Sequence, residues 1–414
     1  MENKGLVIVY NSESHNWKSC EELEESLYRS YKNLCPKNTK FLDLAKDLVN
    51  IETPKVTIVI ITHKVTSNFW AALEKNNLTQ IIWHVFGNFA NLFTSNTNLS
   101  SILEQFHITL VAASSAQANR INYYLQKDNY KSIKVLSFSA DSNSFRQRSQ
   151  IENEKTRKKY SLKSEDYLIC YAGRLSFQKN ITLLLKQFSE FAAQDSKANL
   201  LLCGNFDDLG FTEIGLKIST NAYQAQIMRY LDSLPLSIKS RIKFLGNLDK
   251  ESLAEILSTS DLFISLSTYI LEDFGLAPVQ ALLSGTPVAI SNWGGYRDTK
   301  IKLEKDVDLI DIRLDDDLLI NTEDIMRVLS KYSKKKLTHL EKTELAKKTK
   351  SIYSSENLKE RLRVLLRENS HEKFPGFNQK VMLDFTPEEE EILLTALSKL
   401  NKHLKEIYLG SEKI

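Results

Sequence analysis

Two stretches of the 414-residue chain carry side chains whose types and spacing suit the binding of an anion. In the later stretch, the acidic pair Glu272-Asp273 precedes Phe274-Gly275, and an apolar helix is predicted from Leu276 to Leu283. The first N–H groups of such a helix have no intrahelical partner, and the positive end of its dipole stabilises a phosphate. Gly275 lacks a side chain, so we expect the backbone to approach a ligand closely here.

The earlier stretch brings two cations to the end of a strand. The apolar run from Tyr167 to Ala172 predicts a buried strand that ends at Gly173, and the following loop carries Arg174 and Lys179 before a helix begins. Arg can contact a phosphate through two N–H groups and Lys adds a point charge, so the pair suits a diphosphate. Taken alone, such a pair is equally typical of solvated loop cations.

Together the two stretches resemble the nucleotide-sugar motifs of the family 4 retaining glycosyltransferases. That family has a glutamate, then Phe-Gly, then Gly-x-Pro-Val; here Glu272, Phe274-Gly275 and the run from Gly285 to Val288 match. The run from Gly173 to Leu175, with Lys179 five residues after the Arg, matches the family's phosphate-binding loop. The resemblance covers roughly residues 55 to 300 and is most specific between Tyr171 and Asp298.

The resemblance implies a fold, a donor and roles for individual residues. The implied fold is GT-B: α/β, with two Rossmann-like domains facing a cleft, here followed by a helical C-terminal extension. Arg174 and Lys179 would neutralise the diphosphate leaving group of a nucleotide-sugar donor, and Glu272 would bind hydroxyls of the donor sugar, with no metal or other cofactor. The sugar would be transferred with retention of configuration. The implied nucleotide-sugar-binding residues are Gly173, Arg174, Lys179, Glu272, Phe274, Gly275, Leu276 and Gln280.

Gln280 departs from the family pattern. It stands eight residues after Glu272, where the family has a second glutamate that binds the ribose hydroxyls. A glutamine still donates and accepts hydrogen bonds, but it lacks the charge that makes a carboxylate a strong acceptor. The substitution leaves two interpretations open: an active enzyme with altered donor binding, or a degenerate domain.

The family also places a histidine near the tip of a first-domain strand, facing the sugar. His84, in the run from Trp83 to Gly87, is the best match, and His63 is the second. The implied catalytic set is therefore His84, Arg174, Lys179 and Glu272. Considered without the resemblance, a histidine inside an apolar strand is as typical of a structural, hydrogen-bonded ring.

The elements that must position these residues alternate between short apolar runs and longer helical patterns, which predicts parallel sheets with crossover helices. Two open α/β domains follow from this alternation, and such sheets bind ligands at the carboxyl ends of their strands. The polar stretch from Asp141 to Asp166 is predicted to be the linker. The predicted divisions are an acceptor-side domain over 1–150, a nucleotide-sugar-binding domain over 151–320 and a helical region over 321–414.

The C-terminal region is predicted to be helical. The lysine-rich pattern from Glu323 to Ser370 is most typical of solvated helix faces. Thr386 and Pro387 are good first residues for a further helix over 386–409, whose apolar stripe would pack on the core of the chain or on a partner.

Composition excludes several classes of function. A formal net charge of +3 is too mild to indicate nucleic-acid binding. The four cysteines have no metal or redox spacing, and we assign no metal to the acidic triplet Asp315 to Asp317. Apolar runs are too short for a membrane span or a signal peptide, so a cytoplasmic location is expected, and membrane-surface contact is not indicated.

Three functions are therefore compared. The first is a glycosyltransferase acting on an unidentified glycan, lipid-linked or protein acceptor. The second is a catalytically degenerate glycosyltransferase-like domain that serves as a binding or scaffolding partner. The third, a different nucleotide-binding enzyme such as a sugar-phosphate epimerase, would need a carboxylate and histidine set that the sequence does not show.

Overall fold

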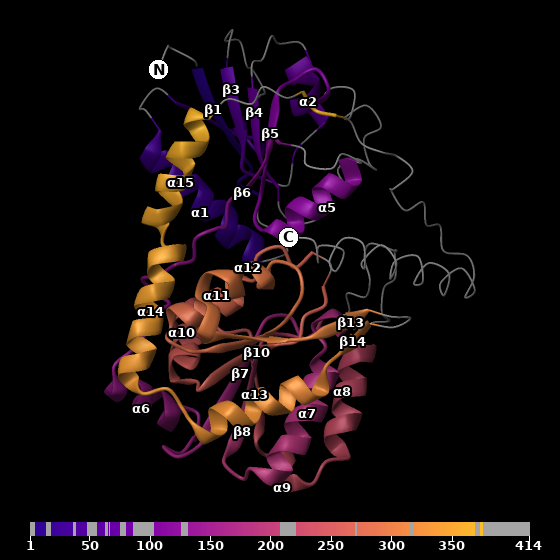
Figure 1. The fold of residues 1–414 in the computed structure, drawn as a ribbon, viewed down its shortest axis with the longest axis vertical. Helices are drawn as coiled ribbons and strands as arrows, with labels where there is room; N and C mark the ends of the chain where they lie inside the picture. The colour runs from indigo at the N-terminus through magenta and orange to yellow at the C-terminus, as the bar shows by residue number, and fades with distance from the viewer. Residues whose placement is uncertain are drawn as a thin grey trace, which may run out of the picture. The chain divides into compact units, whose positions relative to one another are not determined.

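The structure is a computed structural model that describes most of the chain in two compact units (Figure 1). Unit 1 contains the described residues up to Ala140 and those from Tyr353 onward; unit 2 contains Asp141–Ile352. The described residues are 5–13, 18–35, 39–47, 56–62, 65, 67–74, 80–85, 103–125, 131–207, 221–269, 271–314, 318–368 and 373–375.

Unit 1 is built on a six-stranded parallel sheet with the strand order β2-β1-β3-β4-β5-β6. Its central strands are apolar on both faces, as expected for a parallel sheet covered by helices. The strands are β1 Gly5–Tyr10, β2 Lys40–Asp43, β3 Val56–Ile60, β4 Gln80–Val85, β5 Ile108–Ala112 and β6 Ile133–Val135. The helices are α1 Lys18–Leu34, α2 Ser67–Glu74, α5 Ser115–Leu125 and α15 Ser355–Arg367.

Unit 2 contains a second six-stranded parallel sheet, in the order β12-β11-β10-β7-β8-β9. The order reverses between β7 and β10, which is the topological switch point where doubly wound sheets bind ligands. The strands are β7 Tyr167–Ala172, β8 Ala198–Cys203, β9 Ile242–Gly246, β10 Leu262–Ser265, β11 Val288–Ser291 and β12 Val307–Ile310; β13 Ile312–Leu314 and β14 Leu318–Ile320 form a separate antiparallel pair.

Helices cover both faces of the second sheet, with α10, α11 and α12 on one face and α7, α8 and α13 on the other (Figure 1). The core between the sheet and α7 is formed by apolar side chains such as Leu184, Leu185 and Phe188, whose spacing places them on one face of the helix. The helices are α6 Gln150–Lys159, α7 Ile181–Gln194, α8 Ala222–Asp232, α9 Leu236–Lys239, α10 Lys250–Thr259, α11 Leu276–Leu283, α12 Tyr296–Leu303, α13 Thr322–Lys334 and α14 His339–Tyr353, with short 3-10 turns η1 Phe177–Lys179 and η3 Glu304–Asp306.

These two sheets confirm the predicted α/β fold of two Rossmann-like domains. The polar stretch predicted as a linker is instead folded into unit 2. Ser149 and Glu152 form a capping box that starts α6, and α6 packs against α10. Arg148 is buried beside α10 and donates to Glu251 Oε1 at 2.5 Å, so the charges in this stretch are paired within the unit.

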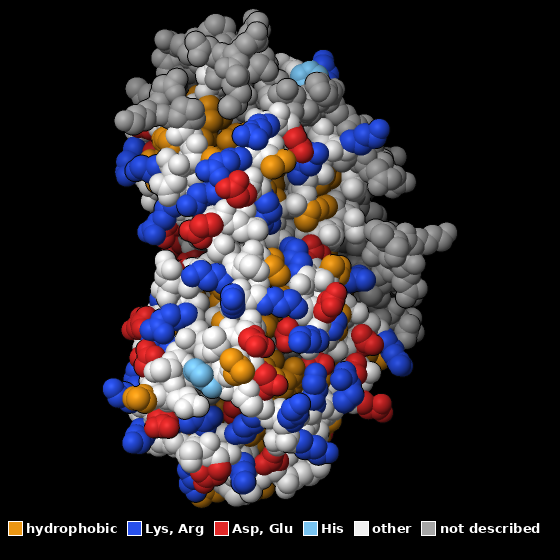
Figure 2. All heavy atoms as spheres, turned by 60° about the vertical axis from the view of Figure 1, so that its left-hand side comes forward, with side chains coloured by type: hydrophobic (Ala, Val, Ile, Leu, Met, Phe, Trp, Pro, Cys, Tyr) orange, Lys and Arg blue, Asp and Glu red, His pale blue; other side chains and the backbone are white. Residues whose placement is uncertain are grey.

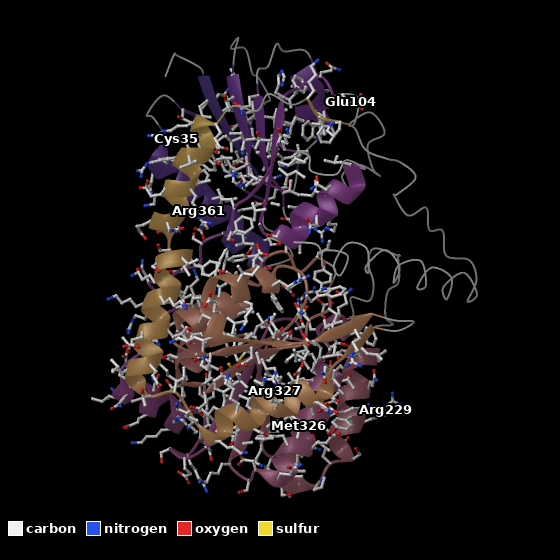
Figure 3. All side chains as sticks on the ribbon, viewed as in Figure 1. Cys35, Glu104, Arg229, Met326, Arg327 and Arg361 are labelled. Atoms are coloured by element: carbon white, nitrogen blue, oxygen red, sulfur yellow. The ribbon has the colours of Figure 1, made fainter. Side chains whose placement is uncertain are left out.

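The predicted helical C-terminal region is shared between the two units. Helices α13 and α14 belong to unit 2, whereas α15 packs against α1 in unit 1 through Leu358, Leu362 and Leu365. Arg361 lies on the same helix (Figure 3). The predicted helix over 386–409 and the triplet Asp315 to Asp317 lie outside the described residues.

The lysine-rich helices present a mixed surface. On the face shown in Figure 2, Lys and Arg side chains alternate with Asp and Glu side chains over unit 2. Arg327 on α13, for example, is half exposed and contacts Asp324 at 2.9 Å (Figure 3). Such residues form solvated helix faces, whereas Lys342 on α14 is buried and its Nζ donates to the carbonyl of Ser260 at 2.5 Å.

Candidate functional site

The candidate site lies at the switch point of unit 2, where the loops after β7 and β10 meet. Strand β7 ends at Gly173, whose N–H donates to the carbonyl of Cys203 at 2.9 Å. Arg174 follows at once, and Lys179 closes the 3-10 turn η1 before α7 begins. Strand β10 leads into the loop that carries Glu272. The two motifs found about ninety residues apart in the sequence are therefore neighbours in space.

Hydrogen bonds fasten these two loops together. Asn180 has a left-handed backbone (φ 54°) that lets its amide turn back, and its Nδ2 donates to the carbonyl of Leu266 at 2.8 Å and to Thr268 Oγ1 at 2.9 Å. The N–H of Thr268 donates to the carbonyl of Gln178 at 3.0 Å. These side-chain and backbone hydrogen bonds fix the positions of the cationic loop and the acidic loop relative to each other.

Arg174 forms an ion pair within the unit. Its Nη1 donates to Asp207 Oδ2 at 2.6 Å, and its guanidinium lies over the ring of Tyr269 at 5.5 Å from the centroid. Burial lowers the pKa of Arg174, but the hydrogen bond and charge of Asp207 outweigh burial and raise the pKa above its ordinary value. Arg174 is therefore a permanent cation at the edge of the site.

Lys179 is paired with the acidic loop. Its Nζ donates to Glu272 Oε2 at 2.5 Å and to Ser267 Oγ at 3.1 Å, and Ser267 donates in turn to the same carboxylate oxygen at 2.7 Å. The side chains of Lys179 and Glu272 are only 13% and 12% exposed, so solvent screens their attraction weakly. Lys179 also lies over the ring of Tyr269, at 5.1 Å.

The turn at Gly294-Gly295 contacts the loop that carries Glu272 and holds it in place. The N–H of Gly295 donates to the carbonyl of Glu272 at 2.7 Å. A Cβ atom at Gly295 would lie 2.2 Å from the carbonyl oxygen of Asp273, so the two loops can approach only because the residue is glycine. The indole of Trp293 donates to the carbonyl of Tyr269 at 2.9 Å.

Gly275 is required by the conformation of its own backbone and by a neighbouring ring, and the close approach of a ligand at this residue stays a prediction. It has a left-handed backbone (φ 80°) as the N-cap of α11, and a Cβ atom there would lie 2.6 Å from the ring of Tyr296. The space beside its backbone is therefore filled by an aromatic ring. Burial raises the pKa of Tyr296 well above its ordinary value, and the charge of Glu272 raises it further, so the phenol stays neutral beside the acid.

The other predicted binding residues lie around α11. Phe274 is buried just before the helix, and Leu276, its first residue, is half buried. Gln280 lies in the second turn and is 4% exposed. A side chain this deeply buried favours the neutral amide over a carboxylate as long as no ligand is bound.

His84 lies in unit 1, on β4. Its Nε2 and the hydroxyl of Tyr31, on α1, are 2.7 Å apart, and the residue is 2% exposed. Burial lowers the pKa of His84 to about 3, which keeps the imidazole neutral. These contacts are those of a structural, hydrogen-bonded histidine. They do not support a catalytic role for His84, which stays a prediction. His63 lies outside the described residues.

Three residues of the site were not predicted from the sequence: Asp207, Ser267 and Tyr269. Ser267 and Tyr269 lie in the polar turn before Glu272, and Asp207 comes four residues after Cys203. Nothing in their own spacing indicates contact with Arg174 or Lys179, because these contacts depend on the way β7, β8 and β10 lie side by side. The one feature of the sequence that could have indicated these three residues is that all of them follow the ends of predicted strands.

Within the described residues, no group of three or more His, Cys, Asp or Glu side chains could hold a metal ion. None of the described helices is long and apolar enough to cross a membrane.

The fold of the chain is similar to that of solved glycosyltransferase structures with two α/β domains. A glycosyltransferase from Rickettsia africae superposes with a TM-score of 0.62 at 13% identity, over 90% of this chain and 100% of that one. HepE from Anabaena, solved in complex with UDP, superposes with a TM-score of 0.60 at 15% identity, over 88% of this chain and 99% of that one.

Residues 152–317, all in unit 2, match the model of the family described as glycosyl transferases group 1. An uncharacterized glycosyltransferase of Methanocaldococcus jannaschii is 25% identical over 34% of this chain and 30% of its own length. Mannosylfructose-phosphate synthase of Agrobacterium fabrum is 26% identical over 40% of this chain and 34% of its own length. The chain thus matches about a third of the length of these curated relatives.

Proposed function

We propose that this protein is a glycosyltransferase that moves a sugar from a nucleotide-diphosphate sugar to an acceptor, with retention of configuration at the anomeric carbon. The observation that carries the proposal is the pair of cations at the switch point of unit 2. Arg174 and Lys179 contact the same ring, that of Tyr269, beside the loop that leads into α11. A diphosphate is the ligand whose charge and length suit two neighbouring cations at a helix N-terminus.

The chemistry that these residues support is departure of the nucleoside diphosphate. When the bond between the anomeric carbon and the phosphate oxygen breaks, the electron pair stays on that oxygen, and negative charge develops on the leaving group. Arg174 and Lys179 would stabilise that charge in a partly buried site, where electrostatic contacts are stronger than in water. This proposal needs no metal, because the two cations take the role that a metal would have.

In the ligand-free site each of the two cations is already paired with a carboxylate. Arg174 is matched by Asp207, and Lys179 is matched by Glu272. A diphosphate therefore has to compete with two carboxylates. In the proposed complex, Glu272 turns to hydroxyls of the donor sugar, as the resemblance implies, and Lys179 becomes available to the phosphates.

The test is a binding screen of the purified protein against UDP, GDP and ADP and their common sugar conjugates, by thermal shift and calorimetry. UDP comes first because HepE was solved with UDP. Each charge-assisted contact contributes about 1.5–3 kcal/mol, so an Arg174→Ala, Lys179→Ala variant should lose at least about a hundredfold in affinity.

The matched control is a Lys239→Ala, Arg327→Ala variant. It removes the same charge from unit 2, but both residues form exposed surface pairs, with Asp232 and Asp324. It should bind the nucleotide as the wild type does. If the folded wild type binds none of the nucleotides, the donor assignment is refuted and the degenerate binding partner becomes the better interpretation.

A further inference from the structure

We propose that Tyr269 is a positioning residue that makes the site select a diphosphate over a monophosphate. The inference rests on the proposed function, since it concerns the same nucleotide site. It does not follow from the resemblance, which assigns no role to the turn between Ser267 and Glu272. It follows from the way one aromatic ring lies against both cations of the site.

One aromatic ring contacts both cations of the site. The guanidinium of Arg174 lies 5.5 Å and the Nζ of Lys179 lies 5.1 Å from the centroid of Tyr269. The face of an aromatic ring carries partial negative charge, so each contact is attractive, and the attraction is greatest where water is excluded. Tyr269 is 7% exposed, which places these contacts in a poorly solvated environment.

The backbone of Tyr269 is itself fixed. Its carbonyl accepts hydrogen bonds from the indole of the buried Trp293 at 2.9 Å and from the N–H of Glu272 at 3.0 Å. Its N–H donates to Ser267 Oγ at 3.3 Å. The backbone of Tyr269 is therefore held in place, and its ring contacts both cations before any ligand arrives.

This arrangement favours a ligand that contacts both cations at once. A diphosphate has one phosphate for each cation, whereas a monophosphate engages chiefly one of them. A pre-organised pair lowers the entropy lost on binding only for the ligand that uses the pair. Loss of the ring should therefore weaken diphosphate binding more than monophosphate binding.

The experiment measures the ratio of two dissociation constants, monophosphate over diphosphate. The ligands are those of the nucleoside that the wild type binds most tightly among uridine, guanosine and adenosine. Tyr269→Phe keeps the ring and should keep the wild-type ratio within about twofold. Tyr269→Leu removes the ring and should lower the ratio about tenfold. If Tyr269→Leu does not fold, Tyr269→Met, which fills a similar volume without a ring, replaces it.

The possible results separate three conclusions. A general loss of structure in Tyr269→Leu weakens both ligands in proportion, leaves the ratio unchanged and overturns the positioning role. A ratio that falls equally in Tyr269→Phe also overturns it, because the hydroxyl and not the ring would then be responsible. A wild type that binds no nucleoside diphosphate overturns the proposed function and this inference together.

Discussion

The replacement Gln280→Glu tests the site through two effects of opposite sign. Gln280 is 4% exposed, in the second turn of α11. A carboxylate there would lose nearly all of its hydration, and burial penalises a charged group more than a neutral amide. Burying this charge in place of the amide should cost at least about 1–3 kcal/mol, so the ligand-free variant should be less stable than the wild type by that amount at pH 7.5.

The loss of stability should depend on pH in a defined direction. Burial raises the pKa of the new carboxyl in the folded state above its unfolded value of about 4.3. As the pH falls below about 4.3 the group becomes protonated in both states, and the variant should approach the wild type. As the pH rises through the interval between the two pKa values, the difference grows by about 1.4 kcal/mol per pH unit and then levels off.

The nucleotide should reverse part of this effect. In the proposed complex, ribose hydroxyls donate to position 280, and a carboxylate accepts more strongly than an amide. The variant should therefore show a larger stabilisation by nucleoside diphosphate than the wild type, with about tenfold tighter binding.

The assay is urea unfolding from pH 4 to 8, with and without nucleotide. Gln150→Glu is the control, because Gln150 is exposed in the first turn of α6, where an added acid is favourable. The reasoning is refuted if Gln280→Glu is as stable as the wild type at pH 7.5, or if it binds nucleotide more weakly.

Two further predictions concern the support of the acidic loop and the core of unit 1. Gly295→Ala should lower the free energy of unfolding by about 1–3 kcal/mol and weaken nucleotide binding, because its Cβ would lie 2.2 Å from the carbonyl oxygen of Asp273; unchanged urea unfolding would contradict this. His84, with its folded pKa lowered to about 3, should stabilise the protein fully above pH 6.5 and progressively less as the pH falls, by at most about 1.4 kcal/mol per unit. A His84→Phe, Tyr31→Phe variant should lose that part of the pH dependence in urea unfolding, and an identical pH profile would show that His84 does not titrate as its burial requires.

The elements predicted best from the sequence are those whose own residues form a clear pattern. Strand β7 and helix α11 were predicted with the bounds that the structure has, because each is an apolar run ended by glycine. Since parallel strands end at the same edge of a sheet, the proximity of Arg174, Lys179 and Glu272 followed from their places after strand ends. The family model then matched residues 152–317, which contain all three.

The sequence was misleading where the composition of a segment disagrees with its local structure. The stretch from Asp141 to Asp166 is polar enough for a linker. Ser149 and Glu152 within it nevertheless have the spacing of a capping box, and they start helix α6. The contacts of Tyr269 and Asp207 with the cations join three different loops. No pattern within a single segment predicts them, because they depend on how the strands are ordered in the sheet.

The return of α15 to unit 1 sets an order for folding during synthesis. Residues 141–352 leave the ribosome as one continuous segment and can complete the second sheet with its helices at once. The first unit has to wait for α15, which packs against α1 and is made more than two hundred residues later than Ala140. A nascent chain stalled before α15 would lack this contact and would leave the surface of α1 that α15 covers open to chaperones.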